Sequence, residues 1–431
     1  AGLYLGTNQG HPGAMVIRKS LCLFCSLGCG LAFRMKGEEA IAIDYDGPIC
    51  PRGHYNFELI NHPERLTQPL IGKRPVKWEE AVKHIKDELK QFKPEEVAVA
   101  VAPILNNEAA AAAVKLANGL GTTNLSVIGS PADLEAYSPE PGATLDEIEN
   151  AEALLIVGDL LTRSAVLSKR VNKVKYGARG NKIIVVDPNR SHTAWFATRH
   201  LQIESGTEAR ALTGDFSDFQ AAKSGVIVIA PSERIKRNDL VVHFTRQLAA
   251  ASPNKKVSTF YEQGNTFGFG ELIAKGLPYG ELLGRIDAGE IKAMIMIGDD
   301  LAASSPELAK KIRHLRFTVL ANFFAREQTD ETLVTLPLAG HLETGGSVSF
   351  PDGRRMTVEP VVPKVGAKSV LEIAELLGAG DDSLAGRARP PLDPAEVKDI
   401  SVSAPYPPAN ITHFGNNNLV KRFFWYKVNN E

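Results

Sequence analysis

The sequence predicts an α/β protein in which a small N-terminal module precedes two open parallel-sheet domains. Three observations lead to this prediction. Short, continuously apolar runs, typical of strands buried in parallel sheets, recur from about residue 96 onward. Helical stretches separate these runs, as in chains that alternate strand and helix. The first 65 residues lack this alternation and are instead short, glycine-rich segments punctuated by cysteines.

The individual elements follow from periodicity. The stretch 78–92 is predicted to be an amphipathic helix, because its apolar and charged residues fall on opposite faces. Helices are also predicted at 107–121, which ends in glycine, and at 163–180. The predicted strands are 96–103, 153–158, 182–188, 225–231, 293–300 and 317–324. Since they are too many and too widely spread for one sheet, we expect two sheets.

The chain is expected to divide into four units. The predicted boundaries are 1–65 for the N-terminal module, 66–124 and 225–375 for a discontinuous α/β domain, 125–224 for a second α/β domain, and 376–431 for an extended C-terminal arm. The arm is rich in proline and asparagine and has no periodicity. Its aromatic cluster suggests that it docks on this chain or on another one: Phe423, Phe424, Trp425 and Tyr426.

Composition excludes several classes of protein. Lys and Arg (49) nearly balance Asp and Glu (50), which argues against a nucleic-acid or membrane-surface role. No apolar run reaches the ~18–20 residues that span a bilayer, so no transmembrane segment is predicted. The N-terminal region shows no secretory signal, and four clustered cysteines make a disulfide framework improbable. We therefore expect a cytoplasmic protein.

All four cysteines lie within the first 50 residues, in the pattern Cys22-x2-Cys25-x3-Cys29-x20-Cys50. Structural zinc usually takes two tight C-x2-C pairs, which this spacing does not provide. A thioredoxin-like redox pair would need a βαβ setting, which is absent here. Three neighbouring cysteines and a distant fourth suit the corners of a [4Fe–4S] cubane. The pattern favours an iron–sulfur cluster, with zinc and buried structural cysteines as the alternatives.

Longer stretches carry a resemblance to a known family. The cysteines are followed by "PRGHYNFELINHPERLTQPLI" (51–71) and "PVKWEEAVKHIKDEL" (75–89), and further stretches match in order at 119–125, 144–171, 180–212, 286–308 and 343–362. Together they resemble the molybdopterin oxidoreductase superfamily. That superfamily includes the formate dehydrogenase large subunit, the formylmethanofuran dehydrogenase molybdopterin subunit and the large iron–sulfur subunit of complex I. The resemblance extends to about residue 375.

The resemblance implies cofactors and site residues. Family members bind one [4Fe–4S] cluster through four cysteines, which here are Cys22, Cys25, Cys29 and Cys50. Beside the cluster, two α/β domains hold the guanine ends of a bis-pterin cofactor.

Four further residues match cofactor-binding positions of the family. Asp187 stands where a carboxylate reads guanine or ribose, and Gly298 and Asp299 occupy a second strand end, the usual ligand crevice of open α/β sheets. Arg52 replaces a family lysine between pterin and cluster. A bound molybdopterin guanine dinucleotide is thus implied, although strand-to-helix turns favour Asp and Gly for their own reasons.

The sequence also departs from the family. Family enzymes ligate molybdenum or tungsten through a Cys, selenocysteine, Ser or Asp in the stretch that corresponds to 126–143, which contains no Cys here. Ser130, Asp133 and Ser138 could supply oxygen, but none lies in a recognisable ligand motif. The stretch 211–230 is much shorter than in the active enzymes. The family's C-terminal β-barrel domain is not expected in this chain, although the formylmethanofuran enzyme carries it on a separate subunit.

These features favour an iron–sulfur electron-transfer subunit of a multi-subunit oxidoreductase complex that has lost the catalytic metal. Such a subunit would not itself be the site of substrate chemistry. Its partners would be other redox subunits, with iron–sulfur or flavin centres linked to NAD(P)H or ferredoxin. Two alternatives remain open: a catalytic molybdenum or tungsten subunit related to formate or formylmethanofuran dehydrogenase, and a structural scaffold whose cluster only stabilises the N-terminal module.

Overall fold

The fold is described from a computed structural model, which describes residues 15–45, 47–327, 332–384 and 392. The predicted arm at 376–431, with its four aromatic residues, lies almost entirely outside the described residues. None of the helices in the described part of the chain has the length and hydropathy that a bilayer span requires.

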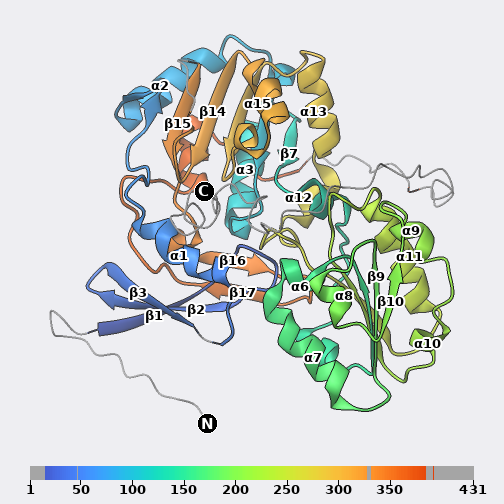
Figure 1. Cartoon of the computed structure of the whole chain (residues 1–431). Coiled ribbons are helices and arrows are strands. Elements are labelled where there is room, and N and C mark those ends of the chain that lie inside the picture. The colour runs from blue at the N-terminus through green and yellow to red at the C-terminus, as the bar shows by residue number, and fades with distance from the viewer. Residues whose placement is uncertain (1–14, 46, 328–331, 385–391, 393–431) are drawn as a thin grey trace.

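The N-terminal module is a three-stranded antiparallel sheet followed by one helix (Figure 1). Its elements are β1 (Met15–Leu21), β2 (Gly30–Lys36), β3 (Glu39–Tyr45) and α1 (Pro51–Asn61). Leu21 pairs with Gly30 at the end of the β1–β2 ladder, so residues 22–29, with three of the cysteines, form the connecting loop. The fourth, Cys50, is the residue that immediately precedes α1.

A seven-stranded sheet forms the first α/β domain, in the order β5-β4-β15-β14-β13-β6-β7. Its five long strands are parallel, and β4 and β5 add an antiparallel edge. The strands are β4 (Leu70–Ile71), β5 (Arg74–Pro75), β6 (Val97–Val101), β7 (Leu125–Val127), β13 (Ala293–Ile297), β14 (Phe317–Asn322) and β15 (Leu333–Pro337).

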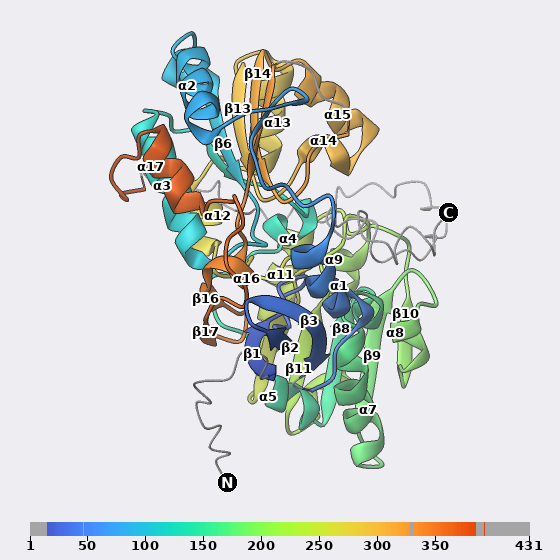
Figure 2. The ribbon, with the colours of Figure 1, turned by 90° about the vertical axis from the view of Figure 1, so that its left-hand side faces the viewer.

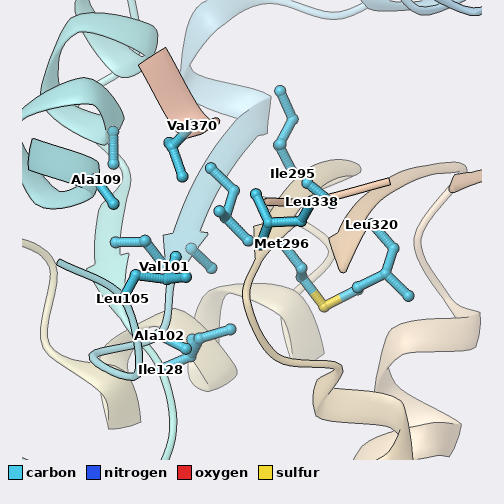
Figure 3. Packing of buried hydrophobic residues seen from close by; sticks show 14 of the residues in the cluster. Val101, Ala102, Leu105, Ala109, Ile128, Ile295, Met296, Leu320, Leu338 and Val370 are labelled. Carbon is cyan, nitrogen blue, oxygen red and sulfur yellow. The ribbon is translucent and has the colours of Figure 1, made fainter. Parts of the chain in front are cut away.

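Helices cover both faces of this sheet (Figure 2). One face carries α2 (Trp78–Leu89), α3 (Asn107–Gly119) and α17 (Val370–Leu377), and the other carries α13 (Tyr279–Asp287), α14 (Leu301–Ser304) and α15 (Pro306–Arg313). The short helix α12 (Gly270–Lys275) packs against β7. Figure 3 shows how apolar side chains from β6, β13 and β14 pack with those of α3 and α17. Burial on both faces explains why these strands are continuously apolar in sequence.

A five-stranded, all-parallel sheet forms the second α/β domain, in the order β10-β9-β8-β11-β12. Its strands are β8 (Ala153–Val157), β9 (Lys182–Asp187), β10 (Arg199–Gln202), β11 (Gly225–Ile229) and β12 (Lys255–Thr259). Its helices are α5 (Leu145–Glu149), α6 (Leu160–Arg163), α7 (Ser168–Gly177), α8 (His192–Trp195), α9 (Glu208–Ala211), α10 (Ser217–Gln220) and α11 (Asn238–Ala250). The remaining elements are α4 (Pro131–Glu135), α16 (His341–Thr344), the hairpin of β16 (Gly346–Ser349) and β17 (Arg355–Val358), and two 3₁₀ turns, Pro94–Glu96 and Ala165–Leu167.

The predicted fold class is confirmed, but the sheets divide the chain differently from the predicted boundaries. The segment 125–224 was expected to form the second domain, whereas its first strand, β7, belongs to the seven-stranded sheet. The segment 225–375 was assigned to the first domain, whereas β11 and β12 complete the five-stranded sheet. Periodicity identifies a buried strand, but tertiary packing decides which strand it pairs with.

The cysteine loop is fixed to the segment that follows β12. The amide of Ser26 donates to the carbonyl of Tyr261 (3.0 Å), and the amide of Tyr261 donates back to the Ser26 hydroxyl (2.8 Å). The amide of Gly264 donates to the carbonyl of Leu23 (3.0 Å). A Cβ at Gly264 would lie 2.6 Å from the Leu23 Cα, so only glycine permits this approach.

The other side of the cysteine loop packs on the β16–β17 hairpin. Leu21 and Leu23 form a small buried cluster with Val348 and Phe350 of the hairpin segment. The ring of Phe350 lies where a Cβ of Gly28 would be, and Gly28 has a φ of +64°. The loop is therefore held between two segments that lie far from it in sequence.

We predict that Gly264→Ala lowers the free energy of unfolding by about 1–3 kcal/mol, because the added methyl group pushes the cysteine loop away from its partner. The measurement is urea unfolding, followed by fluorescence and circular dichroism. Gly284→Ala is the matched control, since Gly284 lies inside α13 with open space around it. There the same change should raise stability by up to about 1 kcal/mol. Equal effects of the two substitutions would contradict the proposed packing constraint.

Candidate functional site

The four cysteines form one cluster at the junction of the N-terminal module and the α/β domains. Cys22 and Cys25 are buried, and Cys29 and Cys50 are partly exposed. The loop closes on itself through a hydrogen bond from the Cys22 amide to the Cys29 carbonyl (2.9 Å). Charge on Cys50 influences each of the other three thiols, so the residue that precedes α1 lies beside the loop.

Polar donors point at the sulfur atoms. The backbone amide of Phe24 donates to Cys22, and that of Leu27 donates to Cys25. The Asn56 side chain, on α1, also hydrogen-bonds Cys22. Donors of this kind stabilise thiolates and tune the potential of a bound cluster. The donor set therefore fits thiolate ligands of a metal centre.

The free thiols themselves resist ionisation. Burial, together with Cys25 and Cys50, raises the pKa of Cys22 to about 12. Burial also raises the pKa values of Cys25 and Cys29, although Arg52 opposes it at both positions. Because metals bind thiolates, loading this site must displace protons, and the charge of the bound group must offset the repulsion between the sulfurs.

As they stand, no three Cys, His, Asp or Glu side chains among the described residues converge tightly enough to hold one metal ion. A single zinc ion would require such convergence of all its ligands. A [4Fe–4S] cluster makes a different demand, because each cysteine binds a separate iron atom. A [4Fe–4S] cluster bound by these four cysteines therefore stays a prediction.

Arg52 links this cluster to the α/β domains. It lies in the first turn of α1, is 4% exposed, and donates from Nη2 to the carbonyl of Arg163. It also hydrogen-bonds Cys50. Burial lowers the pKa of Arg52, but the charges of Cys25, Cys50 and Glu262 outweigh burial and raise it above its usual value. A fixed positive charge therefore stands beside the thiols.

A buried ionic line continues from Arg52. Arg163, at the end of α6, pairs with Glu262 at 2.7 Å, with both side chains largely buried. Asp133, on α4, is 1% exposed and accepts hydrogen bonds from the amides of Glu262 (2.7 Å) and Gln263 (3.1 Å). Burial raises the pKa of Asp133 to about 7, against the opposing effect of Arg163. These residues join the segments after β7, β8 and β12.

Three atoms along this line are buried without a hydrogen-bond partner among the described residues: Asp133 Oδ1, Arg163 Nη1 and Gln263 Oε1. An unsatisfied buried polar atom costs about 1–3 kcal/mol, so ordered water or a polar ligand is expected to satisfy these three. One is a donor and two are acceptors. The set could therefore accommodate a heterocycle with both functions, such as a pterin.

A cavity of about 590 Å³ lies next to this line, between the end of β7 with α4, the loop after β11, and α12–α13. Its volume is in the range of small-molecule and cofactor sites. The polar residues of its wall include Glu135, Glu233 and Tyr279, among apolar side chains. Burial, with the charges of Asp299 and Glu233, raises the pKa of Tyr279 to about 12. The cavity thus adjoins the strand end that carries Asp299.

The other residues predicted to bind a cofactor, Gly298, Asp299 and Asp187, lie at strand ends and not beside the cysteines. Gly298 follows β13 with a φ of +84°, and its amide donates to the carbonyl of Ala321 (2.9 Å). Its neighbour Asp299 accepts from the amide of Asp300 (2.8 Å). Asp300 is the buried member of this turn and forms a bidentate pair with Arg326 (2.7 and 2.9 Å).

Asp187 ends β9 and is 3% exposed. Its carboxylate accepts hydrogen bonds from the Asn189 amide (2.7 Å) and the Ser191 hydroxyl (3.1 Å), as an ordinary turn residue does. Glu208, at the start of α9, lies close enough to feel its charge. Glu208 Oε2 is buried without a hydrogen-bond partner among the described residues, whereas Oε1 accepts from the Gly206 amide (3.3 Å).

The structure therefore brings Arg52 to the four cysteines and leaves Asp187 and the Gly298–Asp299 turn at two separate strand ends. Sequence reasoning missed several residues that the structure points to: Arg163, Glu208, Glu262 and Gln263. Asp133 was predicted only as one of three possible oxygen ligands of molybdenum or tungsten. Arg163 and Glu262 give no local signal, because they follow β8 and β12, which come into the same sheet only through β11 between them.

We predict a pH-dependent effect of Glu208→Gln. Burial raises the pKa of Glu208 to about 7, so the folded state disfavours its ionised form. Wild-type stability should therefore fall as the pH rises from about 4.5 to about 7, and the uncharged variant should lack this loss. The variant should gain on the order of 1–3 kcal/mol relative to the wild type over this range.

Urea unfolding at a series of pH values measures this difference. Glu372→Gln is the control, because Lys364 and the amide of Ser369 overcome burial and lower the pKa of Glu372 to about 2. Its effect on stability should be the same from pH 4.5 to 8. A flat difference for Glu208→Gln as well would contradict the burial argument.

Comparisons with known proteins identify the family to which the chain is similar. Residues 65–378 match the molybdopterin oxidoreductase family model. Subunit alpha of the NADPH-Fe(3+) oxidoreductase of Geobacter sulfurreducens is 24% identical over 463 residues, which cover 83% of this chain and 54% of that protein. Subunit alpha of F420-dependent formate dehydrogenase 2 of Methanococcus maripaludis is 29% identical over 208 residues, which cover 44% of this chain and 31% of that protein.

Among solved structures, acetylene hydratase from Pelobacter acetylenicus superposes with a TM-score of 0.66 and 16% sequence identity, covering 84% of this chain and 68% of that one. This match shows a shared fold. The chain spans about half or less of the length of the curated relatives that it matches.

Proposed function

The chain belongs to the molybdopterin oxidoreductase family, and we propose that it is an iron–sulfur subunit that relays single electrons in a multi-subunit oxidoreductase complex. In this proposal Cys22, Cys25, Cys29 and Cys50 hold one [4Fe–4S] cluster. Other redox subunits, with iron–sulfur or flavin centres, supply and accept its electrons. A cytoplasmic location stays a prediction.

The observation that carries the proposal is the set of donors gathered around four thiols. Two backbone amides, the Asn56 side chain and the Arg52 guanidinium all face sulfur atoms. For one-electron transfer a protein has to supply thiolate ligands, burial and such donors, and the cluster supplies the redox change. The site offers each of these without any further residue.

The loop after β7 supports a relay without its own catalytic metal. Its three candidate ligand oxygens have structural roles. Ser130 caps α4, where its hydroxyl accepts from the Asp133 amide (3.4 Å), and the Ser138 hydroxyl accepts from Arg246 (2.5 Å). Asp133 Oδ2 accepts two backbone amides. Such contacts hold the loop in place. The loop contains no cysteine that could ligate a metal.

One observation favours a second candidate, a catalytic subunit that binds a pterin cofactor. Asp133 Oδ1, Arg163 Nη1 and Gln263 Oε1 remain unpartnered among the described residues, and Glu208 Oε2 remains unpartnered near Asp187. A carboxylate of this kind suits the N–H groups of a guanine edge. A pterin-bound molybdenum or tungsten would supply two-electron chemistry. The residues would then bind and orient the cofactor and exclude water from it.

Metal analysis of the purified full-length protein, in its native complex, separates the two candidates. The relay predicts about four iron atoms per chain, as a [4Fe–4S] cluster contains, with neither molybdenum nor tungsten. Stoichiometric molybdenum or tungsten would overturn the relay and support the second candidate. Zinc in place of iron would overturn both.

We predict that Cys25→Ala abolishes iron binding, because a buried ligand is lost from the centre of the loop. Circular dichroism should still report the two α/β sheets, since their cores do not depend on the cluster. The measurement is iron content per chain after purification without oxygen.

Ser26→Ala is the matched control in the same loop. It removes the acceptor of the Tyr261 amide but no thiol, so it should lower stability by about 1 kcal/mol and retain the iron. Full iron content in Cys25→Ala would show that the ligand assignment is wrong. Loss of iron in both variants would mean that loop position, not ligation, controls binding.

A further inference from the structure

A hollow of about 660 Å³ opens beside Cys29, on the surface between the cysteine loop and the five-stranded domain. Its wall includes Gly28, Cys29 and Gly30 of the loop, together with residues of α5 and α7 and the side chain of Arg354. Cys29 is only partly buried, so this hollow is a place where the cysteine cluster approaches the surface. A partner seated here would come close to the cluster.

Positive charge dominates the wall of the hollow. Lys169, Arg170, Lys173 and Arg354 line it, against the single acid Glu149. Arg170 and Lys173 share Glu149 (2.5 and 2.9 Å), and Arg170 also lies 3.7 Å from Asp146. Arg354 pairs with Asp352 (2.5 Å) just outside the wall. Lys169 is exposed and forms no ion pair with the described residues. After this pairing, the wall still carries excess positive charge.

The same charge extends along the chain on both sides of α7. Between Asp159 and Asp187 the sequence contains no acidic residue, although the whole chain has a formal net charge of −1. The same stretch contains seven cations, of which Arg163 belongs to the buried ionic line. The other six are Lys169, Arg170, Lys173, Lys175, Arg179 and Lys182. Tyr176, at the far end of α7, is 75% exposed. Tyrosine is enriched at protein interfaces relative to the rest of the surface.

We propose that this surface, defined by the hollow beside Cys29 and the exposed side chains of Lys169 and Lys173 on α7, docks a small acidic protein that carries single electrons. The proposal rests on the relay function, since it gives that relay its point of contact. A free small anion would need only the hollow, whereas the charge continues beyond it as far as Arg179. Complementary charge steers such encounters and sets their orientation. In the docked state the reduced carrier would lose one electron and the cluster held by the cysteines would gain it. No atom would be transferred.

The test compares two charge-reversed variants of the full-length protein. Lys169→Glu/Lys173→Glu changes the docking surface at two exposed positions. Lys83→Glu/Lys86→Glu makes the same change in charge at two exposed positions of α2, a helix on the seven-stranded sheet. The probes are an acidic [2Fe–2S] ferredoxin and, as the opposite charge type, a cationic cytochrome c. Calorimetric titration at 20–300 mM salt measures binding, and stopped-flow absorbance measures electron exchange.

We expect ferredoxin to bind the wild type more weakly as salt rises, because the contact is electrostatic. Affinity should fall at least tenfold in Lys169→Glu/Lys173→Glu and less than twofold in the α2 variant. Cytochrome c should not lose affinity in the first variant. Equal loss in the two variants, or binding that ignores salt, would overturn the docking surface.

Failure of the relay and failure of the docking surface give different results. If ferredoxin binds with the expected dependence on Lys169 and Lys173 but exchanges no electrons, the docking surface stands and the relay fails. If electrons exchange at the same rate in both variants, the relay stands and this docking surface is wrong. Iron content and melting temperature of each variant show whether a loss of binding reflects the surface itself.

Discussion

The attachment of the cysteine loop to the segment after β12 is the constraint on which the site depends. The loop has no regular secondary structure of its own, so its backbone groups need partners elsewhere. They find them in Tyr261 and Gly264, while Phe350 closes the opposite side. Through these contacts, one short loop joins the N-terminal module to both the five-stranded domain and the β16–β17 hairpin. The positions of the thiols are therefore set by the packing of the whole molecule and not by the loop alone.

The segment after β12 also carries part of the buried ionic line that begins at Arg52, beside the cysteines. Arg52 reaches the carbonyl of Arg163, Arg163 pairs with Glu262, and the segment after Glu262 binds Asp133. Buried ion pairs contribute little net stability, because desolvation offsets their attraction. The line is better understood as a buried polar connection between the cysteine cluster and the segments that follow β7, β8 and β12. Its unpartnered atoms lie on Asp133, Arg163 and Gln263, while Arg52 keeps positive charge at the cysteine end.

Much of the architecture could be predicted from the sequence, since burial leaves a local pattern in strands such as β6, β8 and β13. Which sheet a strand joins could not, as β7, β11 and β12 illustrate, because pairing depends on contacts far apart in the chain. The grouping of the four cysteines was predictable from their spacing, and their role as metal ligands stays a prediction. Asp133 and Glu262 stand 129 residues apart and leave no joint signal in sequence. Asp187 was predicted from its place at a strand end. In the structure its carboxylate accepts hydrogen bonds from the turn that follows β9.

The central claim is that the cysteine cluster holds one centre that accepts and returns single electrons. An electron paramagnetic resonance titration of the purified full-length protein, poised at stepwise potentials, tests this claim most directly. The account predicts that reduction produces one signal, which integrates to about one spin per chain and disappears on reoxidation. A cluster that stays silent over the whole range would contradict the relay and indicate a structural role. A signal from molybdenum or tungsten would contradict it in favour of a catalytic subunit.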